Sequence, residues 1–344
     1  MPKILEPGEI SALDASALPR IRLPERPSVF ADRARRLRAL ARDNTISGYL
    51  KLMAVVVDAQ HAMLAQAGPA DLDRDSLELA LAHGMPVVPA VSATLDEGWR
   101  DTLQTLVAHV RKAVKADAAL APALSGITPL LDRIDAMSAA DLDRQAAAVL
   151  DRDLDVVDIA VAPFIHAALQ VIWTHRACAL ETTELPYLDT PGLCPACGSP
   201  PVASIVRIGG VHEGYRYLQC SLCATEFHFV RVKCAHCEST KGIAYRSLEL
   251  SQDKAAPDGS PIDIGKATMN PGNRVSATRA ESCDECHSYL KIFAQDKAPE
   301  AEPFADDLAS LTLDLMMNDA GYSRPNPHPF LWPSRVEDVD ASDK

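Results

Sequence analysis

The chain has 344 residues, of which 47% are hydrophobic and 24% are charged, the balance of a folded rather than a disordered protein. A formal net charge of −13 argues against a general nucleic-acid-binding protein and against an anionic membrane surface as a partner. Neither a secretory signal nor a transmembrane helix is apparent, since the apolar stretches 46–66 and 154–173 both contain charged residues. We therefore expect a cytoplasmic protein whose thiols stay reduced.

The N-terminal half has the pattern of a helical domain. Residues 1–27 are rich in proline and show no periodicity, so we interpret them as an extended lead-in. Apolar residues recur at helical spacing over 28–180, which predicts an all-α bundle. Ser28 and Thr94 are candidate helix caps, and Pro163 is expected to kink or break the last helix.

The composition changes at residue 181. Residues 181–193 have the composition of a linker, and short strand-like runs follow, including one that leads into the turn signal Gly209-Gly210. The polar stretch 251–280 is rich in Pro and Gly, and we interpret most of it as a long loop. Residues 299–344 are expected to form a C-terminal helix and an acidic, frayed tail.

Eight of the nine cysteines form four CxxC pairs: Cys194 and Cys197, Cys220 and Cys223, Cys234 and Cys237, Cys283 and Cys286. A CxxC turn places two thiolates on one side, and two such turns complete a tetrahedral site for zinc or rubredoxin-type iron. The spacings favour joining the first pair with the second and the third with the fourth. An interleaved arrangement, first with third and second with fourth, stays open.

The sequential arrangement predicts two metal modules, 194–233 and 234–298, each with one four-cysteine site. The overall prediction is an α+β protein: an N-terminal helical bundle, two small β-rich rubredoxin-like or zinc-ribbon modules, and a C-terminal helix. The metals could serve only to hold a small β-rich region together, because such a region has little core of its own. The ligand set suits iron and zinc alike.

Other candidate residues give weaker signals. Cys178 lies on an apolar helix and is interpreted as a core cysteine. Three histidines on or near apolar helical faces are interpreted as hydrogen-bonded core residues: His61, His166 and His175. Three more lie in or beside the cysteine region and could replace a thiolate or tune a site, although eight cysteines already complete two sites: His228, His236 and His287.

Several segments resemble the formate dehydrogenase accessory protein family, called FdhE. They are CPACGSPPVAS, RYLQCSLCATEFHFVRVKCAHC, AESCDECHSYLKIF and, near the C-terminus, ADDLASLTLDLMMNDAGYSR. The resemblance implies a cytoplasmic protein, not an enzyme, that binds the catalytic subunit of a respiratory, molybdenum-containing formate dehydrogenase before export by the twin-arginine route. It also implies that the eight paired cysteines hold two iron ions in rubredoxin-like sites, with zinc as the alternative.

Two other functions stay open at this stage. Iron in four-cysteine sites could pass electrons to a client protein or sense oxygen for it. A zinc-ribbon protein that acts on nucleic acid is less favoured, because the basic residues near the sites form only a modest cluster in an acidic chain: Arg207, Arg216, Arg231, Lys233 and Lys241. The sequence does not indicate an oligomeric state.

Overall fold

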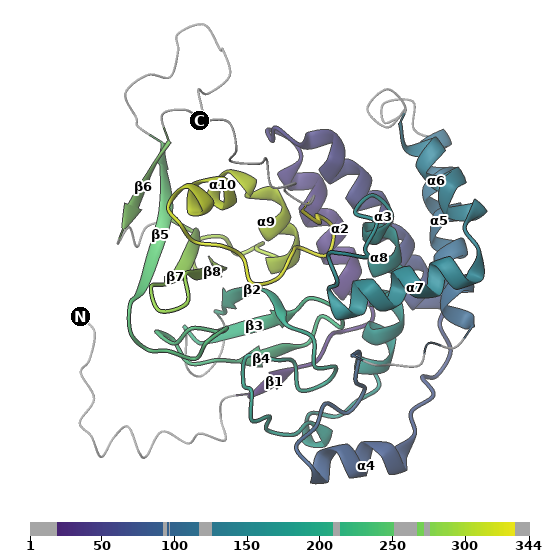
Figure 1. Ribbon diagram of the computed structural model, residues 1–344, viewed down its shortest axis with the longest axis horizontal. Helices are drawn as coiled ribbons and strands as arrows, with labels where there is room; N and C mark the ends of the chain where they lie inside the picture. The colour runs from purple at the N-terminus through teal and green to yellow at the C-terminus, as the bar shows by residue number, and fades with distance from the viewer. Residues whose placement is uncertain are drawn as a thin grey trace, which may run out of the picture.

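A computed structural model describes residues 19–91, 95, 97–116, 126–208, 214–250, 267–271 and 276–333, and the statements below refer to these residues. Of residues 249–250 and 267–271 it describes the backbone alone. Helices occupy one side of the molecule and a sheet the other, with two C-terminal helices between them (Figure 1). No helix in these ranges is both long and apolar enough to cross a membrane.

The N-terminal half is helical. Its helices are α2 (Val29–Leu40), α3 (Ser47–Gln66), α4 (Arg74–Ala82), α5 (Gly98–Ala116), α6 (Ile127–Ala136), α7 (Ala139–Asp151) and α8 (Ala162–Ala177). Pro163 lies in the first turn of α8, where its missing N–H leaves no carbonyl unpaired, so the predicted break falls between α7 and α8. Ser28 stands at the N-cap of α2 without a side-chain cap, and Thr94 and Gly209-Gly210 lie outside the described residues.

Helix α8 is the centre of this half and its link to the rest of the chain. It packs against α3, α5 and α7, and it is buried on nearly every side. The Gln60 amide donates to Gln170 Oε1 on α8 over 2.9 Å, and the Gln170 amide donates to the carbonyl oxygen of Ser221 over 2.7 Å. Since Ser221 lies inside the second CxxC turn, a buried hydrogen-bond chain ties the helical core to the cysteine region.

The strands form one continuous sheet in the order β1-β4-β3-β2-β8-β7-β5-β6. Their bounds are β1 (Ile21–Arg22), β2 (Pro201–Val206), β3 (Arg216–Cys220), β4 (Glu226–His228), β5 (Ile243–Leu250), β6 (Ala267–Pro271), β7 (Thr278–Cys283) and β8 (Ser288–Ala294). Neighbouring strands are antiparallel except β2 and β8, which run parallel with Ile205 opposite Phe293.

Two halves of this sheet repeat one arrangement. In each half a CxxC turn leads into a strand, that strand pairs with a second strand, and another CxxC turn forms the hairpin to a third. The first half has the strand order β4-β3-β2 and the second half β8-β7-β5. The two halves join through the parallel pair of β2 and β8. The sheet therefore contains two copies of one unit, joined into a single sheet rather than separated into two small ones.

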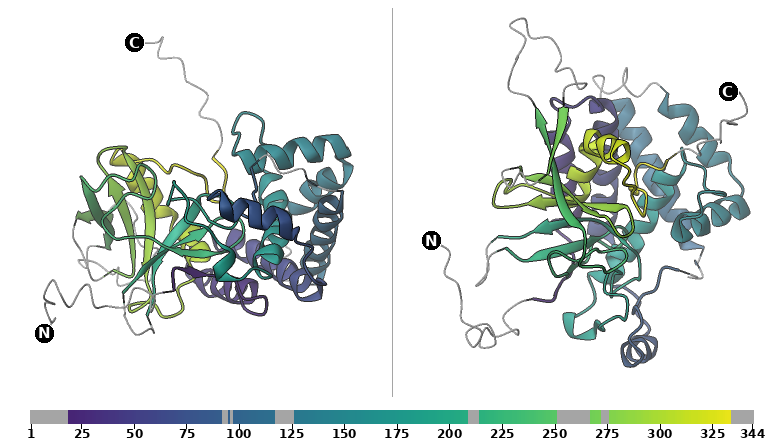
Figure 2. Two further views of the ribbon diagram at one scale, coloured as in Figure 1. Left: turned by 90° about the horizontal axis from the view of Figure 1, so that it is seen from below. Right: turned by 60° about the vertical axis from the view of Figure 1, so that its left-hand side comes forward.

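The C-terminal segment is two helices rather than the single helix predicted. Helix α9 (Pro303–Ala309) and helix α10 (Leu311–Asp319) meet at Ser310, whose backbone is not helical. Helix α9 contacts both α2 and the sheet, and α10 contacts β7. This C-terminal segment therefore lies between the N-terminal helices and the sheet (Figure 2). The break leaves Leu315 exposed, although its spacing from Leu308 and Leu311 would place the three on one face of a single helix.

Two predicted irregular segments contain strands. The predicted loop over 251–280 is wrong at its C-terminal end, because β6 and the start of β7 fall within it. Strand β1 lies in the predicted lead-in, where Ile21 pairs with Phe227 of β4. Tertiary contacts hold this short strand in place: Tyr217 donates its hydroxyl to the carbonyl of Pro19 over 2.8 Å. A two-residue strand has no pattern that a sequence alone could show.

Candidate metal centres

The first group of cysteines lies where β2, β3 and β4 meet the helical half. Cys194 and Cys197 form the turn before β2, while Cys220 ends β3 and Cys223 belongs to the turn into β4. Their sulfurs converge: Cys194 Sγ lies 3.5 Å from Cys223 Sγ, and Cys197 Sγ lies 3.3 Å from Cys220 Sγ. All four sulfurs lie within 4.8 Å of one another.

The second group repeats this arrangement in the other half of the sheet. Cys234 Sγ lies 3.8 Å from Cys286 Sγ, and Cys237 Sγ lies 3.7 Å from Cys283 Sγ. These four sulfurs also lie within 4.8 Å of one another. The structure thus gathers the cysteines as the sequential arrangement predicts and not as the interleaved one does.

The sulfur positions suit a tetrahedral metal ion. Four sulfurs at about 2.3 Å from a common centre lie about 3.8 Å from one another in a regular tetrahedron. The closest sulfur pairs of the second group match this spacing, and those of the first group are slightly shorter. Each group could therefore hold one metal ion with thiolate ligands alone, and the geometry fits iron and zinc equally.

The backbone shapes all four turns in the same way. The residue that follows each CxxC pair has a left-handed conformation, with φ of 76° at Gly198, 60° at Ala224, 62° at Glu238 and 51° at His287. Three of these residues are not glycine, and side chains disfavour this conformation. The same conformation occurs at all four turns although it is unfavourable for three of the four residues. This indicates that the turns are shaped by the need to bring the cysteine sulfurs together.

Hydrogen bonds complete each turn. Two backbone N–H groups, those of Leu222 and Cys223, point at Cys220 Sγ from 3.4 Å each. The same arrangement recurs at Cys234 Sγ. N–H groups aimed at sulfur stabilise its thiolate form, the form that binds a metal. The amide of the first cysteine also donates to a carbonyl five residues on, as in Cys194 to Ser199, Cys220 to Thr225 and Cys234 to Ser239.

One feature of these turns was absent from the sequence prediction. The full repeat is C-x-x-C-x-[ST], with a hydroxyl residue two positions after each pair: Ser199, Thr225, Ser239 and Ser288. The Thr225 hydroxyl lies 3.2 Å from Cys223 Sγ, and the Ser288 hydroxyl lies 3.0 Å from Cys286 Sγ. A hydroxyl that donates to a ligating sulfur tunes the metal site from outside it. The repeat was visible in the sequence and would have identified these residues.

The two groups differ in burial. Every cysteine of the first group is at most 1% exposed. In the second group Cys234 and Cys283 are buried, Cys286 is half-buried and Cys237 is exposed. Burial raises the pKa of the Cys194 and Cys220 thiols well above the usual value. A metal ion must therefore displace protons from the first group, and the buried thiolates then depend on the metal for their charge balance.

The remaining candidates lie outside both groups. Cys178 is half-buried, its thiol donates to the carbonyl of Pro24 over 3.3 Å, and burial raises its pKa to about 11. Within the described ranges the two groups that could hold a metal consist of cysteines alone, so His228, His236 and His287 join neither.

The core histidines differ from one another. His175 Nε2 lies 2.8 Å from the carbonyl oxygen of Gly68, its expected hydrogen-bond partner. His166 is buried, and burial lowers its pKa to about 4, although an interaction with the Ser221 backbone opposes this shift. Neither ring nitrogen makes a hydrogen bond of regular geometry to another described residue. Of the three predicted hydrogen-bonded core histidines, His175 has the hydrogen bond but is only half-buried, and His166 is buried. His61 is half-buried, and its Nδ1 has no hydrogen-bond partner among the described residues.

Three family profiles together match nearly the whole chain: FdhE N-terminal at residues 18–189, FdhE central domain at 193–231 and FdhE C-terminal domain at 232–331. Protein FdhE homolog of Pseudomonas aeruginosa is 37% identical over 331 residues, which cover 96% of this chain and 98% of that protein. Protein FdhE of Escherichia coli O127:H6 is 34% identical over 334 residues, or 96% of this chain and 97% of that protein.

A solved structure agrees with these relatives. The crystal structure of the FdhE protein from Pseudomonas aeruginosa matches with a TM-score of 0.73 and 35% identity, and the match covers 92% of this chain and 100% of that one. The similarity therefore extends over the helical half and both halves of the sheet. The chain belongs to the FdhE family.

Proposed function

We propose that this protein is a cytoplasmic accessory factor that binds the catalytic subunit of a respiratory, molybdenum-containing formate dehydrogenase before that subunit is exported. The observation that carries the proposal is FdhE family membership over 96% of the chain, including every part of the cysteine region. In this role the protein supplies a binding surface and no reaction of its own.

The form of the metal sites supports a binding role. Catalytic zinc sites keep one coordination position open for water or substrate, whereas structural sites fill all four positions with protein ligands. Each group here offers four sulfurs to one centre, so no position is left for a substrate. We propose that the metal ions hold the two halves of the sheet in shape, and that the helical domain 28–180, the linker 181–193 and the modules 194–233 and 234–298 form the client-binding protein together.

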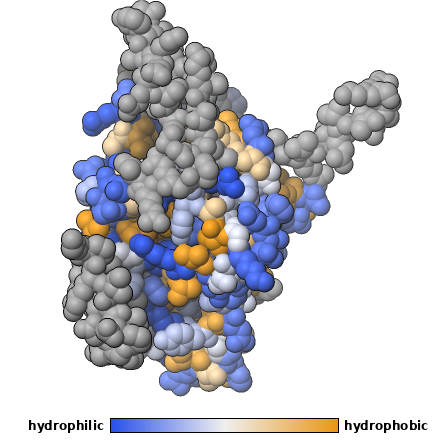
Figure 3. All heavy atoms as spheres, turned by 90° about the vertical axis from the view of Figure 1, so that its left-hand side faces the viewer, coloured by the Kyte–Doolittle hydropathy of each residue, from blue (hydrophilic) through white to orange (hydrophobic). Residues whose placement is uncertain are grey.

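The surface also fits a protein that binds a client transiently. On the coloured part of the face in Figure 3, hydrophobic residues form small groups among hydrophilic ones. Exposed apolar side chains beside the second metal site include Val230 and Val232. Interfaces that form and separate have this mixed character, while permanent interfaces are more uniformly apolar.

The basic residues near the sites give little support to nucleic-acid binding. Arg216 is fully buried and pairs with Glu281, Arg207 pairs with Glu226, and Lys233 pairs with Glu238. A cation that is already paired does not release counterions from a phosphate backbone as a free one would.

The proposal is tested in cells that lack their own copy of this protein. We expect formate dehydrogenase activity to disappear, to return with the wild-type chain, and to return with Cys178→Ser, which keeps all eight paired cysteines. Cys220→Ser should not restore it, and the catalytic subunit should co-purify only with chains that restore activity. Unchanged activity in cells without the protein would refute the accessory role.

A second candidate function is electron transfer through the second metal site. Cys237 is exposed and Cys286 is half-buried, so iron at this site would lie near the surface, where electrons can enter or leave. Iron in a tetrathiolate site cycles between two oxidation states, whereas zinc does not. Protein loaded with zinc alone should fail to restore formate dehydrogenase activity if electron transfer is required. Full activity with zinc would eliminate this candidate.

A further inference from the structure

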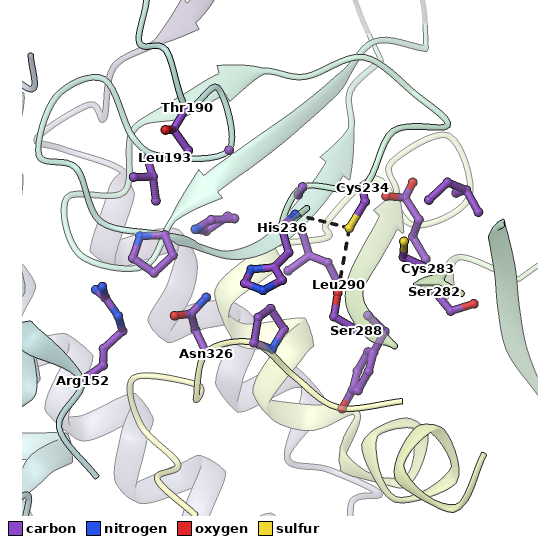
Figure 4. A pocket seen from close by; sticks show the side chains of 18 residues that line it. Arg152, Thr190, Leu193, Cys234, His236, Ser282, Cys283, Ser288, Leu290 and Asn326 are labelled. Carbon is purple, nitrogen blue, oxygen red and sulfur yellow. Dashed lines mark hydrogen bonds between the residues drawn. The ribbon is translucent and has the colours of Figure 1, made fainter. Parts of the chain in front are cut away.

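A cavity of about 310 Å³ lies between the helical half and the second metal site (Figure 4). Its walls come from strands of the sheet and from parts of the chain outside it, among them Arg152 at the end of α7, Leu193 in the linker, Cys234 and His236 in the third CxxC turn, and Asn326 near the C-terminus. The volume is at the lower end of the range for small-molecule pockets. The cavity adjoins the second metal centre, whose Cys234 and Cys283 form part of its wall, and contains no cysteine of the first.

Arg152 is the unusual residue of this cavity. Its side chain is half-buried, yet no carboxylate among the described residues lies within ion-pair distance of it. Its one hydrogen bond within the described part of the chain is a long one, 3.4 Å to the carbonyl of Leu150. By contrast, Arg100 and Arg111 of the same helical half each pair with aspartates at 2.7 Å. Its neighbour Asp151 and the Cys197 and Cys220 thiols act on it electrostatically, but none of them makes a hydrogen-bonded ion pair with the guanidinium. A partly buried guanidinium gains most from a partner that it can hydrogen-bond directly.

The backbone at Arg152 adds a second, independent observation. Arg152 ends α7 in the left-handed conformation, with φ 59° and ψ 34°, and its N–H bonds to carbonyls of the last turn. Glycine or asparagine usually occupies this position, because other side chains are strained there. Residues held in such conformations cluster at binding sites.

Other polar groups face the same space. The side chains of Thr190, His236 and Asn326 line the cavity. Thr190 and His236 are exposed and Asn326 is half-buried, so these groups are open to a ligand or to water. In Figure 4 Asn326 lies beside Arg152, and His236 lies between Asn326 and Cys234. The four polar groups therefore extend from the helical half to the third CxxC turn.

The wall is preformed because the linker packs directly on the third CxxC turn. A Cβ at Gly192 would lie 2.2 Å from the carbonyl oxygen of Ala235, so only glycine permits this approach. Apolar residues, among them Leu193, Ile243 and Leu290, supply much of the remaining surface, together with Glu281, Ser282 and Ser288. A cation, uncharged hydrogen-bonding groups and apolar walls together suit a ligand with one negative charge and a short apolar body.

We propose that this cavity binds a carboxylate, with Arg152 as its ion-pair partner, Asn326 and Thr190 as hydrogen-bond partners and the apolar wall in contact with the carbon chain. Arg guanidinium groups bind carboxylates through two parallel hydrogen bonds. A phosphate dianion fits less well, because Glu281 also lines the cavity and tetrathiolate sites carry excess negative charge. The carboxylate comes either from a small free molecule or from a polypeptide segment that enters the cavity.

A simpler role for Arg152 is to balance nearby negative charge, since Asp151 and then the Cys197 and Cys220 thiols of the first metal site act on its guanidinium. That role makes a different prediction. If Arg152 only balances charge, its replacement should weaken metal binding, and the cavity should bind carboxylates no better than their neutral analogues.

The test uses the full, metal-loaded chain and titration calorimetry with butyrate, its neutral isostere butyramide, and inorganic phosphate. We expect butyrate to bind at least about tenfold more tightly than butyramide or phosphate, the usual effect of a charged hydrogen bond. Arg152→Met should weaken butyrate binding by about tenfold, Arg152→Lys should weaken it less, and Arg144→Met, an exposed control on the same helix, should leave it unchanged.

An acetylated peptide with a free C-terminal carboxylate, compared with its amide, distinguishes the two sources of the carboxylate. Tighter binding of the acid peptide than of butyrate assigns the site to a polypeptide, and weaker binding assigns it to a small molecule. Equal binding of butyrate and butyramide by the wild type, or no binding of either, would overturn the proposal, even if Arg152→Met fails to fold. Phosphate that binds as tightly as butyrate would overturn the assignment to carboxylates.

Discussion

The two metal centres have the same ligands, turns and strand arrangement but lie in different surroundings. The four cysteines of the first group are part of the apolar core that joins both halves of the chain. Backbone amides of Val88 and Ala90 donate to the carbonyls of Ala196 and Cys197, over 2.8 and 2.9 Å. The second group is less completely covered: the linker packs on its Ala235 through Gly192, but Cys237 reaches solvent. One structural unit has thus been placed once inside the core and once at the surface.

This difference teaches that sequence repeats need not imply equal roles. A buried thiolate site that loses its metal leaves charge or unpaired thiols inside the core, which is costly. A surface site that loses its metal can relax toward water. We therefore expect the first site to support global stability and the second to respond to the environment.

The largest expected effect is the loss of one buried ligand. Cys220→Ser should lower the free energy of unfolding by at least about 4 kcal/mol, since it empties a metal site inside the core. Cys237→Ser should cost about half as much, because water can replace an exposed ligand. Chemical denaturation, with metal content measured in parallel, gives both values. Equal losses in the two variants would show that burial does not separate the sites.

The next effect concerns the link between the two halves of the sheet. Arg216 on β3 pairs with Glu281 on β7 over 2.7 Å, and both side chains are buried. Arg216 also donates to the carbonyl of Lys233, the residue before Cys234. Arg216→Met should cost about 3 kcal/mol, because the buried Glu281 carboxylate loses its ion-pair partner and, among the described residues, keeps only the hydrogen bond with Tyr245 and the more distant charge of Arg279.

Two controls sharpen this measurement. Arg231→Met removes an exposed arginine near the same strands and should change stability by less than about 0.5 kcal/mol. The double variant Arg216→Met with Glu281→Leu should recover most of the loss, since both charges are then gone. If the double variant is as unstable as the single one, packing rather than charge holds the two halves together.

The two sites should release their metal ions at different rates. A water-soluble chelator should remove one ion per chain at least about tenfold faster than the other, a difference of about 1.4 kcal/mol in activation free energy. Cys237→Ser protein should lose the fast phase and keep the slow one. Release of both ions in a single phase in the wild type would contradict different accessibility of the two centres.

The smallest effect is expected at Cys178, the cysteine that lies outside the four CxxC pairs. Cys178→Ser should retain both metal ions and change the free energy of unfolding by less than about 1 kcal/mol, because its thiol makes one weak bond to the Pro24 carbonyl. Loss of a metal ion in this variant would mean that Cys178 takes part in a site, and the assignment of four ligands to each centre would be wrong.

The sequence predicted local features well. The apolar stripe of Trp99, Leu103, Leu106 and Val110 is completely buried on one face of α5, as its spacing indicated. The sequential grouping of the cysteines followed from short spacings, within which a hairpin or a single strand is the simplest connection. Such features depend on residues close together in the chain.

The features that the sequence did not predict depend on distant contacts. The parallel pair of β2 and β8 joins Ser204 to Ile292, and strand β2 is buried along its whole length, so no alternation marks its faces. The buried chain from Gln60 through Gln170 reaches the second CxxC turn only after folding. The cavity beside Arg152 is assembled from segments that have no common pattern in the sequence.

The short strand β1 has a consequence for the order in which the protein forms. Ile21 finds its partner Phe227 only after most of the chain has been synthesised. Because translation adds about 5–20 residues per second, strand β1 stays without its partner strand for about 10–40 s. The helical half, whose contacts are more local, has time to fold first. The helical domain of the nascent chain would therefore fold before strand β1 can pair with β4 at the edge of the sheet.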